Sequence, residues 1–298
     1  MPEGDTVAYA ANRIRPVLEG RTPDAILTPQ PRHDRDGWPE RLAGRAIKRI
    51  ETHGKHLFIR FGPRAIQARH DRADRMSSGW FGPRAIQARH DRADRMSSGG
   101  FERSLVLHSH LGMSGMWGVY GPARRWSRSE KRAWIVLRCG EQSVVEFDGP
   151  LLELLTDARV RFDQRLSALG PDVLAEEFDS ERFLRRLRGD DPTRPIGDAL
   201  LDQRNVAGIG NIWKAEGCWE AGVDPWRAVA EVPNADAVGI IDAMRPRMLR
   251  SAEEGPRSIR PRVYRLSGRP CPRCGSAITV SGQGDANRMT YWCPGCQH

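Results

Sequence analysis

The chain has 298 residues, of which 39% are hydrophobic and 29% are charged. This length and apolar content suit two domains, each with a core of its own. No apolar run reaches the about eighteen residues of a membrane helix, and no apolar signal segment opens the chain, so we expect a cytoplasmic protein without a membrane span. The formal net charge of +9 favours an acidic partner such as nucleic acid.

The positive charge is carried almost entirely by arginine, because only four of the 47 basic residues are lysines. Such a skew can follow from codon composition, so the total charge alone is weak evidence for binding. The segment 245–269 is more informative, since it holds eight Arg and only two acidic residues. This local excess stands just before a cluster of cysteines.

The first half of the chain predicts one helix followed mainly by strands. Apolar residues recur at helical spacing over 5–19, and Gly20 ends this helix. Alternating apolar and polar residues then predict strands at 45–50, 55–61, 104–110, 133–139 and 143–147. We therefore expect an N-terminal β-sandwich with a leading helix over residues 1–155.

One segment within this region occurs twice, letter for letter, at 61–79 and at 81–99. Structural repeats drift in sequence, so identical copies indicate a recent duplication or an error of sequence assembly. The segment is rich in Arg, Asp, Gly and Ser, which predicts a flexible surface insertion over 61–100. An arginine-rich arm that touches DNA is the alternative.

The second half predicts a helical domain over 156–262. Helical patterns at 151–155 and 162–169 lead to a break at Gly170-Pro171, near the expected domain boundary. Ser180 is expected to cap the next helix. Two further helices flank the glycine-rich turn 206–211 and form a helix–turn–helix unit, whose backbone N–H groups can hold a phosphate. A last helix is expected over about 236–250.

Four cysteines near the end of the chain have the spacing of a zinc site. Cys271-x2-Cys274 and Cys293-x2-Cys296 are separated by eighteen residues. Four thiolates at this spacing predict a zinc ribbon over 263–298 that holds one structural Zn²⁺ ion. Disulfides are disfavoured in a cytoplasmic protein. The isolated Cys139 and Cys218 are predicted to be buried packing residues.

The first three residues, Met1-Pro2-Glu3, predict an unusual nucleophile. If Met1 is removed, Pro2 carries a free secondary amine, and α-amines have a pKa of about 8 against about 10.4 for lysine. The neutral form can attack an electrophilic carbon and form an iminium. Glu3 lies beside the amine and can move protons. A frayed terminus without function is the alternative.

Four motifs occur in order along the chain. They are M-P-E-G at the start, Gly54-Lys55 in a predicted hairpin, A-G-I-G-N ending at Asn211, and R-M-T-Y-W-C-P-G-C-Q from Arg288. Together they resemble the formamidopyrimidine-DNA glycosylase/endonuclease VIII family of base-excision repair enzymes. The resemblance covers the chain except for 61–100. It implies an α+β multidomain fold, with an N-terminal β-sandwich, a helix–two-turn–helix domain and a zinc ribbon.

The resemblance also implies an activity, that of a bifunctional DNA glycosylase and abasic-site lyase acting on double-stranded DNA with damaged bases or abasic sites. Pro2 would attack C1′ of the damaged nucleotide, and Glu3 would transfer protons. Lys55 would contact the backbone beside the lesion and assist catalysis. Asn211 and Arg288 would grip phosphates around the nucleotide once it is flipped out of the stack.

Two departures from the purine-directed branch of the family favour the endonuclease VIII branch and oxidised pyrimidines. Leu151 and Leu152 stand where that branch carries Arg and Phe, and 253–262 is too short for its lesion-capping loop. The motif 110–115 resembles the purine branch, and its Met113 is a candidate wedge into the base stack. Oxidised purines are therefore the first alternative, and a catalytically silent protein that binds damaged DNA is the second. We expect a monomer.

Overall fold

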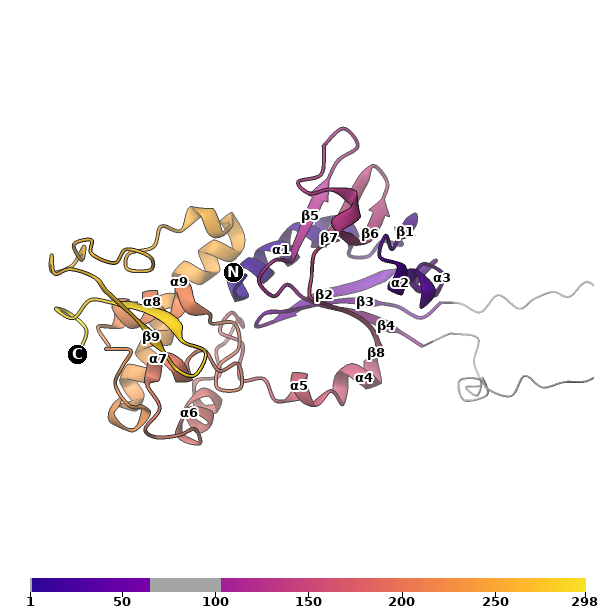
Figure 1. Ribbon diagram of the computed structural model, residues 1–298. Helices are drawn as coiled ribbons and strands as arrows, with labels where there is room; N and C mark the ends of the chain where they lie inside the picture. The colour runs from indigo at the N-terminus through magenta and orange to yellow at the C-terminus, as the bar shows by residue number, and fades with distance from the viewer. Residues whose placement is uncertain (1, 65–102) are drawn as a thin grey trace, which may run out of the picture.

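The structure, a computed structural model, describes residues 2–64 and 103–298 (Figure 1). The expected insertion over 61–100 lies outside the described residues apart from its first four. A β-sandwich with a leading helix forms one part of the molecule, and helices followed by a C-terminal hairpin form the other. This arrangement confirms the predicted fold class. Within the described residues, no helix is long and apolar enough to cross a membrane.

Helix α1, Gly4–Leu18, opens the chain and packs against the sandwich. Its residues Val7, Ala11, Ile14 and Leu18 are buried and recur at the spacing of one helical face. The helix begins within a residue of the predicted start. Its packing fixes the residues immediately before it, which include Pro2 and Glu3.

Two antiparallel four-stranded sheets form the sandwich. The first has the order β1-β6-β7-β5, and the second has the order β2-β3-β4-β8. In the first sheet the strands are β1 Ala25–Leu27, β6 Ala133–Cys139, β7 Gln142–Phe147 and β5 Met116–Tyr120. In the second they are β2 Ile47–His53, β3 His56–Phe61, β4 Leu105–His110 and β8 Leu151–Thr156. Apolar residues of both sheets and of α1 make one core.

The helix predicted at 151–155 is wrong, because these residues form β8 and pair with β4 along their whole length. The run L-L-E-L-L has apolar residues at the two-residue spacing of a strand and also at the three- to four-residue spacing of a helix. Its pattern therefore does not separate helix from strand. Strands β1 and β5 were not predicted. Short helices at α2 Pro31–Arg35, α3 Trp38–Leu42, α4 Asp157–Arg161 and α5 Gln164–Ser167 complete this half.

The helical part has a second apolar core. Its helices are α6 Ser180–Arg188, α7 Ile196–Ala199, α8 Asn211–Ala221 and α9 Asn234–Glu254. It also has 3-10 turns at Val229–Glu231 and Pro256–Ser258, and the sandwich has one at Glu130–Arg132. The cap predicted at Ser180 is wrong by one residue, because the carboxylate of Asp179 accepts the N–H of Arg182 at 2.8 Å. Two strands, β9 Thr279–Gln283 and β10 Arg288–Trp292, form the terminal hairpin.

The two parts of the molecule meet through close backbone approaches. The N–H of Gly4 donates to the carbonyl of Gly208 at 2.8 Å. The β2–β3 turn touches the same segment, where a Cβ added to Gly54 would lie 2.7 Å from the Cβ of Ala207. Asn12 of α1 donates to the carbonyl of Ala252 in α9 at 2.9 Å. The start of α1 and the tip of the β2–β3 hairpin therefore lie against the glycine-rich turn before α8.

Gly54→Ala tests this approach. Gly54 has φ +57, so any side chain strains the backbone by about 1 kcal/mol or more. The contact with Ala207 adds about 2 kcal/mol of overpacking. Gly140→Ala is the matched control, because Gly140 has φ +59 and a Cβ there would meet only the Arg21 guanidinium at 3.4 Å. We expect Gly54→Ala to cost clearly more in urea unfolding, and equal losses would contradict the contact.

Candidate active site

A pocket of about 410 Å³ opens where the two parts of the molecule meet. Pro2 and Thr6 line it from the start of α1, and Met113 lines it from the loop between β4 and β5. Ile212 of α8 and the segment 256–261 complete the wall. The N-terminus in Figure 1 lies between the sandwich and the helices, at this junction. The predicted nucleophile therefore faces a cavity shared by both parts of the chain.

Glu3 is buried, with 1% of its surface exposed, and its carboxyl lies at the N-terminus of α8. Its two oxygens accept the N–H groups of Ile212 at 2.8 Å, Gly210 at 3.1 Å and Trp213 at 3.2 Å. Burial raises the pKa of Glu3 to about 7, against the opposing effects of the Ile212 N–H group and the charge of Lys55. A carboxyl with such a pKa can both take up and release a proton near neutral pH.

The N-terminus of α8 has no side-chain cap of its own, since Gly210 stands at the N-cap. Glu3 supplies the cap from more than two hundred residues away. A Cβ on Gly210 would lie 2.3 Å from Cδ of Glu3, so only glycine fits. The turn and the start of the following helix were predicted to offer N–H groups to a phosphate, but the N–H groups of Gly210, Ile212 and Trp213 bind the Glu3 carboxyl instead.

Lys55 lies in the turn between β2 and β3 and is half-buried. Burial lowers its pKa, the carboxylate of Glu3 raises it, and the charge of Arg288 lowers it further. The charge of Lys55 therefore interacts with the charges of both groups. Lys55, Glu3 and Arg288 come from three distant parts of the chain, and their charges influence one another in the folded protein.

Arg288 begins β10 and is exposed. Within the described ranges, no hydrogen bond or ion pair engages its guanidinium. Its neighbour Met289 is tied to α8, because Nδ2 of Asn211 donates to the Met289 carbonyl at 2.7 Å. The Oδ1 atom of Asn211 is buried without a partner in the described part of the chain.

Lys214 is a site residue that the sequence did not single out. It is completely buried, and its Nζ donates to Oγ1 of Thr290 at 2.6 Å. Burial lowers the pKa of Lys214 to about 8. Together with Asn211, one turn earlier on α8, it fastens the hairpin that carries Arg288. The only sequence signal was its spacing of three residues from Asn211, which places both on one helical face.

Met113 is 75% exposed at the rim of the pocket. Its loop is held from below, where the N–H of Gly112 donates to Nδ1 of His110 at 3.2 Å and the N–H of Gly115 donates to the carbonyl of Leu111 at 2.7 Å. An exposed, flexible apolar side chain on an ordered loop can enter a stack of bases.

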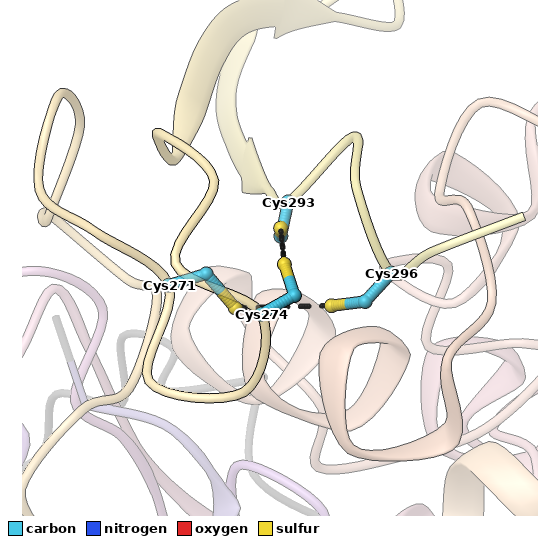
Figure 2. A group of neighbouring side chains, drawn as sticks. All are labelled: Cys271, Cys274, Cys293 and Cys296. Atoms are coloured by element: carbon cyan, nitrogen blue, oxygen red, sulfur yellow. Dashed lines mark hydrogen bonds between the residues drawn. The ribbon is translucent and has the colours of Figure 1, made fainter.

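The four C-terminal cysteines converge around one point, and their sulfur atoms all lie within 4.8 Å of one another (Figure 2). Cys271 and Cys296 are 3.7 Å apart at sulfur, and Cys274 and Cys293 are 3.4 Å apart. These four thiols can hold a metal ion. Cys139 and Cys218 are buried elsewhere, as predicted.

Comparison with known proteins identifies the family. A model of the formamidopyrimidine-DNA glycosylase N-terminal domain matches residues 1–151, and a model of the helix–two-turn–helix domain of the same enzymes matches residues 169–262. The chain belongs to the formamidopyrimidine-DNA glycosylase family. This assignment confirms the predicted family and the predicted class of enzyme, a DNA glycosylase and abasic-site lyase.

Relatives named endonuclease 8 match this family member over its whole length. The probable endonuclease 8 2 of Streptomyces coelicolor is 35% identical over all of this chain and 94% of the relative. Endonuclease 8 2 of Mycobacterium tuberculosis is 33% identical over all of both chains. A formamidopyrimidine-DNA glycosylase of a Caulobacter strain, also matched over all of both chains, is 25% identical. These values confirm the resemblance to the endonuclease VIII branch.

Solved structures show the same fold. The formamidopyrimidine-DNA glycosylase of Lactococcus lactis, crystallised with DNA that contains N7-benzyl-Fapy-dG, has a TM-score of 0.73. It covers all of this chain and all of its own, at 22% sequence identity. The likeness extends from the sandwich through the helices to the C-terminal hairpin.

The raised pKa of Glu3 predicts how stability changes with pH. A carboxyl whose pKa rises from 4.5 to about 7 on folding favours the folded state below pH 4.5, and this contribution is lost as pH rises to 7. The loss is about 3 kcal/mol, since one pKa unit corresponds to about 1.4 kcal/mol. In urea unfolding at pH 5 and pH 8, wild type should therefore lose more stability than Glu3→Gln. Parallel losses in both proteins would contradict the shift.

Proposed function

We propose that this protein is a bifunctional DNA glycosylase and abasic-site lyase that excises oxidised pyrimidines from double-stranded DNA, with the amine of Pro2 as nucleophile. The observation that carries the proposal is the setting of Glu3. A carboxyl with a pKa of about 7 lies directly beside Pro2, and Lys55 lies within its electrostatic reach. Pro2 lines the pocket, Glu3 follows it directly in the chain, and the charge of Lys55 acts on the Glu3 carboxyl, which supports their assignment as nucleophile, proton carrier and cation for the backbone.

The chemistry follows from the amine. Pro2 attacks C1′ of the damaged nucleotide, the bond from C1′ to the base breaks, and the base leaves with the proton that the Pro2 nitrogen loses. Glu3 gives a proton to the ring oxygen of the sugar as the ring opens to an iminium. The iminium acidifies C2′, and loss of that proton expels the 3′ phosphate. A second elimination expels the 5′ phosphate, and water then releases Pro2.

Phosphate contacts hold the flipped nucleotide in this scheme. The guanidinium of Arg288 is exposed and without an acidic partner in the described residues, which suits charge-assisted bonds to phosphate. Lys55 contacts the DNA backbone beside the lesion, and the Asn211 amide at the start of α8 holds the strand that begins at Arg288. Met113 fills the gap in the stack, because it is the exposed apolar residue of the loop at the pocket rim.

The preference for oxidised pyrimidines rests on what surrounds the pocket. Leu151 and Leu152 belong to β8 and pair with β4, so these positions supply no loop that can enter the gap. After α9 ends at Glu254, only the 3-10 turn Pro256–Ser258 and a few residues pass the pocket. Oxidised purines are the alternative, supported by the motif 110–115 that carries Met113.

Trapping with borohydride tests the nucleophile. Reduction of the iminium should join a protein that starts at Pro2 to duplex DNA bearing thymine glycol, and an added residue ahead of Pro2 should abolish the adduct because an acylated nitrogen cannot attack. Thymine glycol should react faster than 8-oxoguanine, and the reverse order would favour the purine alternative. Binding of damaged duplex without any adduct from the Pro2 form would support a silent DNA-binding protein.

The four cysteines are assigned to one structural zinc ion. Sulfur separations of 3.4 and 3.7 Å approach the about 3.8 Å expected for tetrahedral Zn–S bonds of about 2.3 Å. Trp219 of α8 donates from Nε1 to Sγ of Cys271 at 3.3 Å, which ties the cluster to the helical core. The ion would hold the base of the β9–β10 hairpin, whose second strand begins at Arg288, and it takes no part in the reaction.

Metal analysis tests this assignment. The purified protein should contain one zinc per chain, and Cys293→Ser should lose both the zinc and most affinity for DNA, because the hairpin then no longer holds Arg288 in place. Cys139→Ser is the matched control, since Cys139 is a buried thiol in the sandwich and should leave the zinc content unchanged. Full zinc content in Cys293→Ser would contradict the four-thiolate site.

A further inference from the structure

Three histidines, a phenylalanine and a glutamate lie together on the face of the second sheet that points away from the sandwich core. The register places His56 opposite His110, Phe58 opposite His108, and His108 opposite Glu153. Alternate residues of a strand point to the same side, so all five share one face. The rings of Phe58 and His108 stack at 4.8 Å with 10° between their planes, and those of His56 and His108 at 5.1 Å.

Hydrogen bonds join three of these residues into a directed chain. His108 is 1% exposed, and its Nδ1 lies 3.2 Å from Oε2 of Glu153 while its Nε2 lies 2.9 Å from Nδ1 of His56. A carboxylate only accepts, so Nδ1 of His108 donates to it and Nε2 accepts from Nδ1 of His56. Burial lowers the pKa of both rings, that of His56 to about 3, which keeps them neutral as this pattern requires.

The outer end of the chain is fastened to the segment that connects the two parts of the molecule. Nη2 of Arg165 donates to Glu153 at 3.1 Å and to Asp163 at 2.7 Å. The same segment reaches the neighbouring strand, because Nε2 of His53 donates to the carbonyl of Gly170 at 2.9 Å. Residues 163–170 therefore hold the last residue of β2 directly, and they hold the first residue of β3 through the histidine chain.

Lys55 lies in the two-residue turn between those two anchored histidines. The turn also rests on Ala207 and Gly208 through Gly54. His56, His108 and Glu153 do not line the pocket that contains Pro2. These three residues are therefore expected to act on the reaction through Lys55, which directly precedes His56 and whose charge interacts with that of Glu3.

We propose that Glu153, His108 and His56 are positioning residues that fix the placement of Lys55 for catalysis, a proposal that rests on the role of Lys55 given above. The bond from His56 to His108 fixes the ring that directly follows Lys55, and Glu153 fixes which nitrogen of His108 accepts that bond. Apolar side chains would fill the same space. They would not fix an orientation, because only a fully satisfied polar chain selects one arrangement of rings.

The test is a set of variants at His108 measured in single turnover on duplex DNA with an abasic site. His108→Phe keeps the stacking with Phe58 and removes both hydrogen bonds, so we expect about a tenfold slower nicking rate at unchanged DNA affinity, within the about 100-fold that misplacing a group by 1 Å can cost. His108→Gln can still accept from His56 and donate to Glu153, and it should recover most of the rate.

Two further proteins separate positioning from loss of a buried histidine. His33→Phe is the matched control, because His33 is also 1% exposed and stacked on an aromatic ring, that of Trp38 at 3.9 Å, but lies in another element. It should leave the nicking rate unchanged. Glu153→Ala breaks the same hydrogen-bonded series at its partly exposed end. It therefore tests the same idea even if His108→Phe does not fold, and it should also slow nicking.

The decisive comparison repeats His108→Phe in a Lys55→Met background. If His108 acts through Lys55, its substitution should have almost no further effect there. An undiminished further loss, a wild-type rate in both His108→Phe and Glu153→Ala, or a Gln variant as slow as Phe would overturn the proposal. A fully active Lys55→Met would instead overturn the role proposed for Lys55, so the two failures are distinguishable.

Discussion

The contact on which the site depends is the carboxyl of Glu3 at the N-terminus of α8. Burying a carboxyl is costly, and here three backbone N–H groups and the positive end of the helix offset that cost. Glu3 also belongs to α1, because its carbonyl accepts the N–H of Val7 at 3.1 Å in the first turn. One residue therefore serves the start of two helices, and the residue before it is held at their junction.

Glycines allow this junction to be as tight as it is. A Cβ on Gly4 would lie 2.9 Å from the Cα of Gly208, and the Cα of Gly54 lies 3.5 Å from the place of a Cβ on Gly208. Three stretches of backbone, from the start of the chain, the β2–β3 hairpin and the turn before α8, thus meet with no side chain between them. Pro2, Lys55 and the helix that carries Asn211 are placed relative to one another by main-chain contacts, which tolerate little adjustment.

The sequence predicted what depends on local pattern and on motif, and it missed what depends on partners far along the chain. The helix α1 and strands such as β3 and β6 followed from periodicity, and the four cysteines followed from spacing. β8 was mistaken for a helix because the run L-L-E-L-L has apolar residues at the spacing of a strand and also at the spacing of a helix. Lys214 had only its spacing from Asn211 as a local signal, and the hydrogen-bonded residues from His56 to Glu153 had none, since each is defined by a bond to a residue tens of positions away.

The site holds two positive charges, those of Lys55 and Arg288, and the carboxylate of Glu3 favours the charged form of Lys55. The charge of Arg288 lowers the pKa of Lys55, which means that the two cations repel each other. Buried contacts hold them there nonetheless, through Asn211 and Lys214 below the hairpin of Arg288 and through the anchored turn of Lys55. A phosphate between the two cations would turn this repulsion into attraction. If Lys55 and Arg288 contact phosphates as proposed, part of the stabilisation of the complex with DNA is prepared when the protein folds.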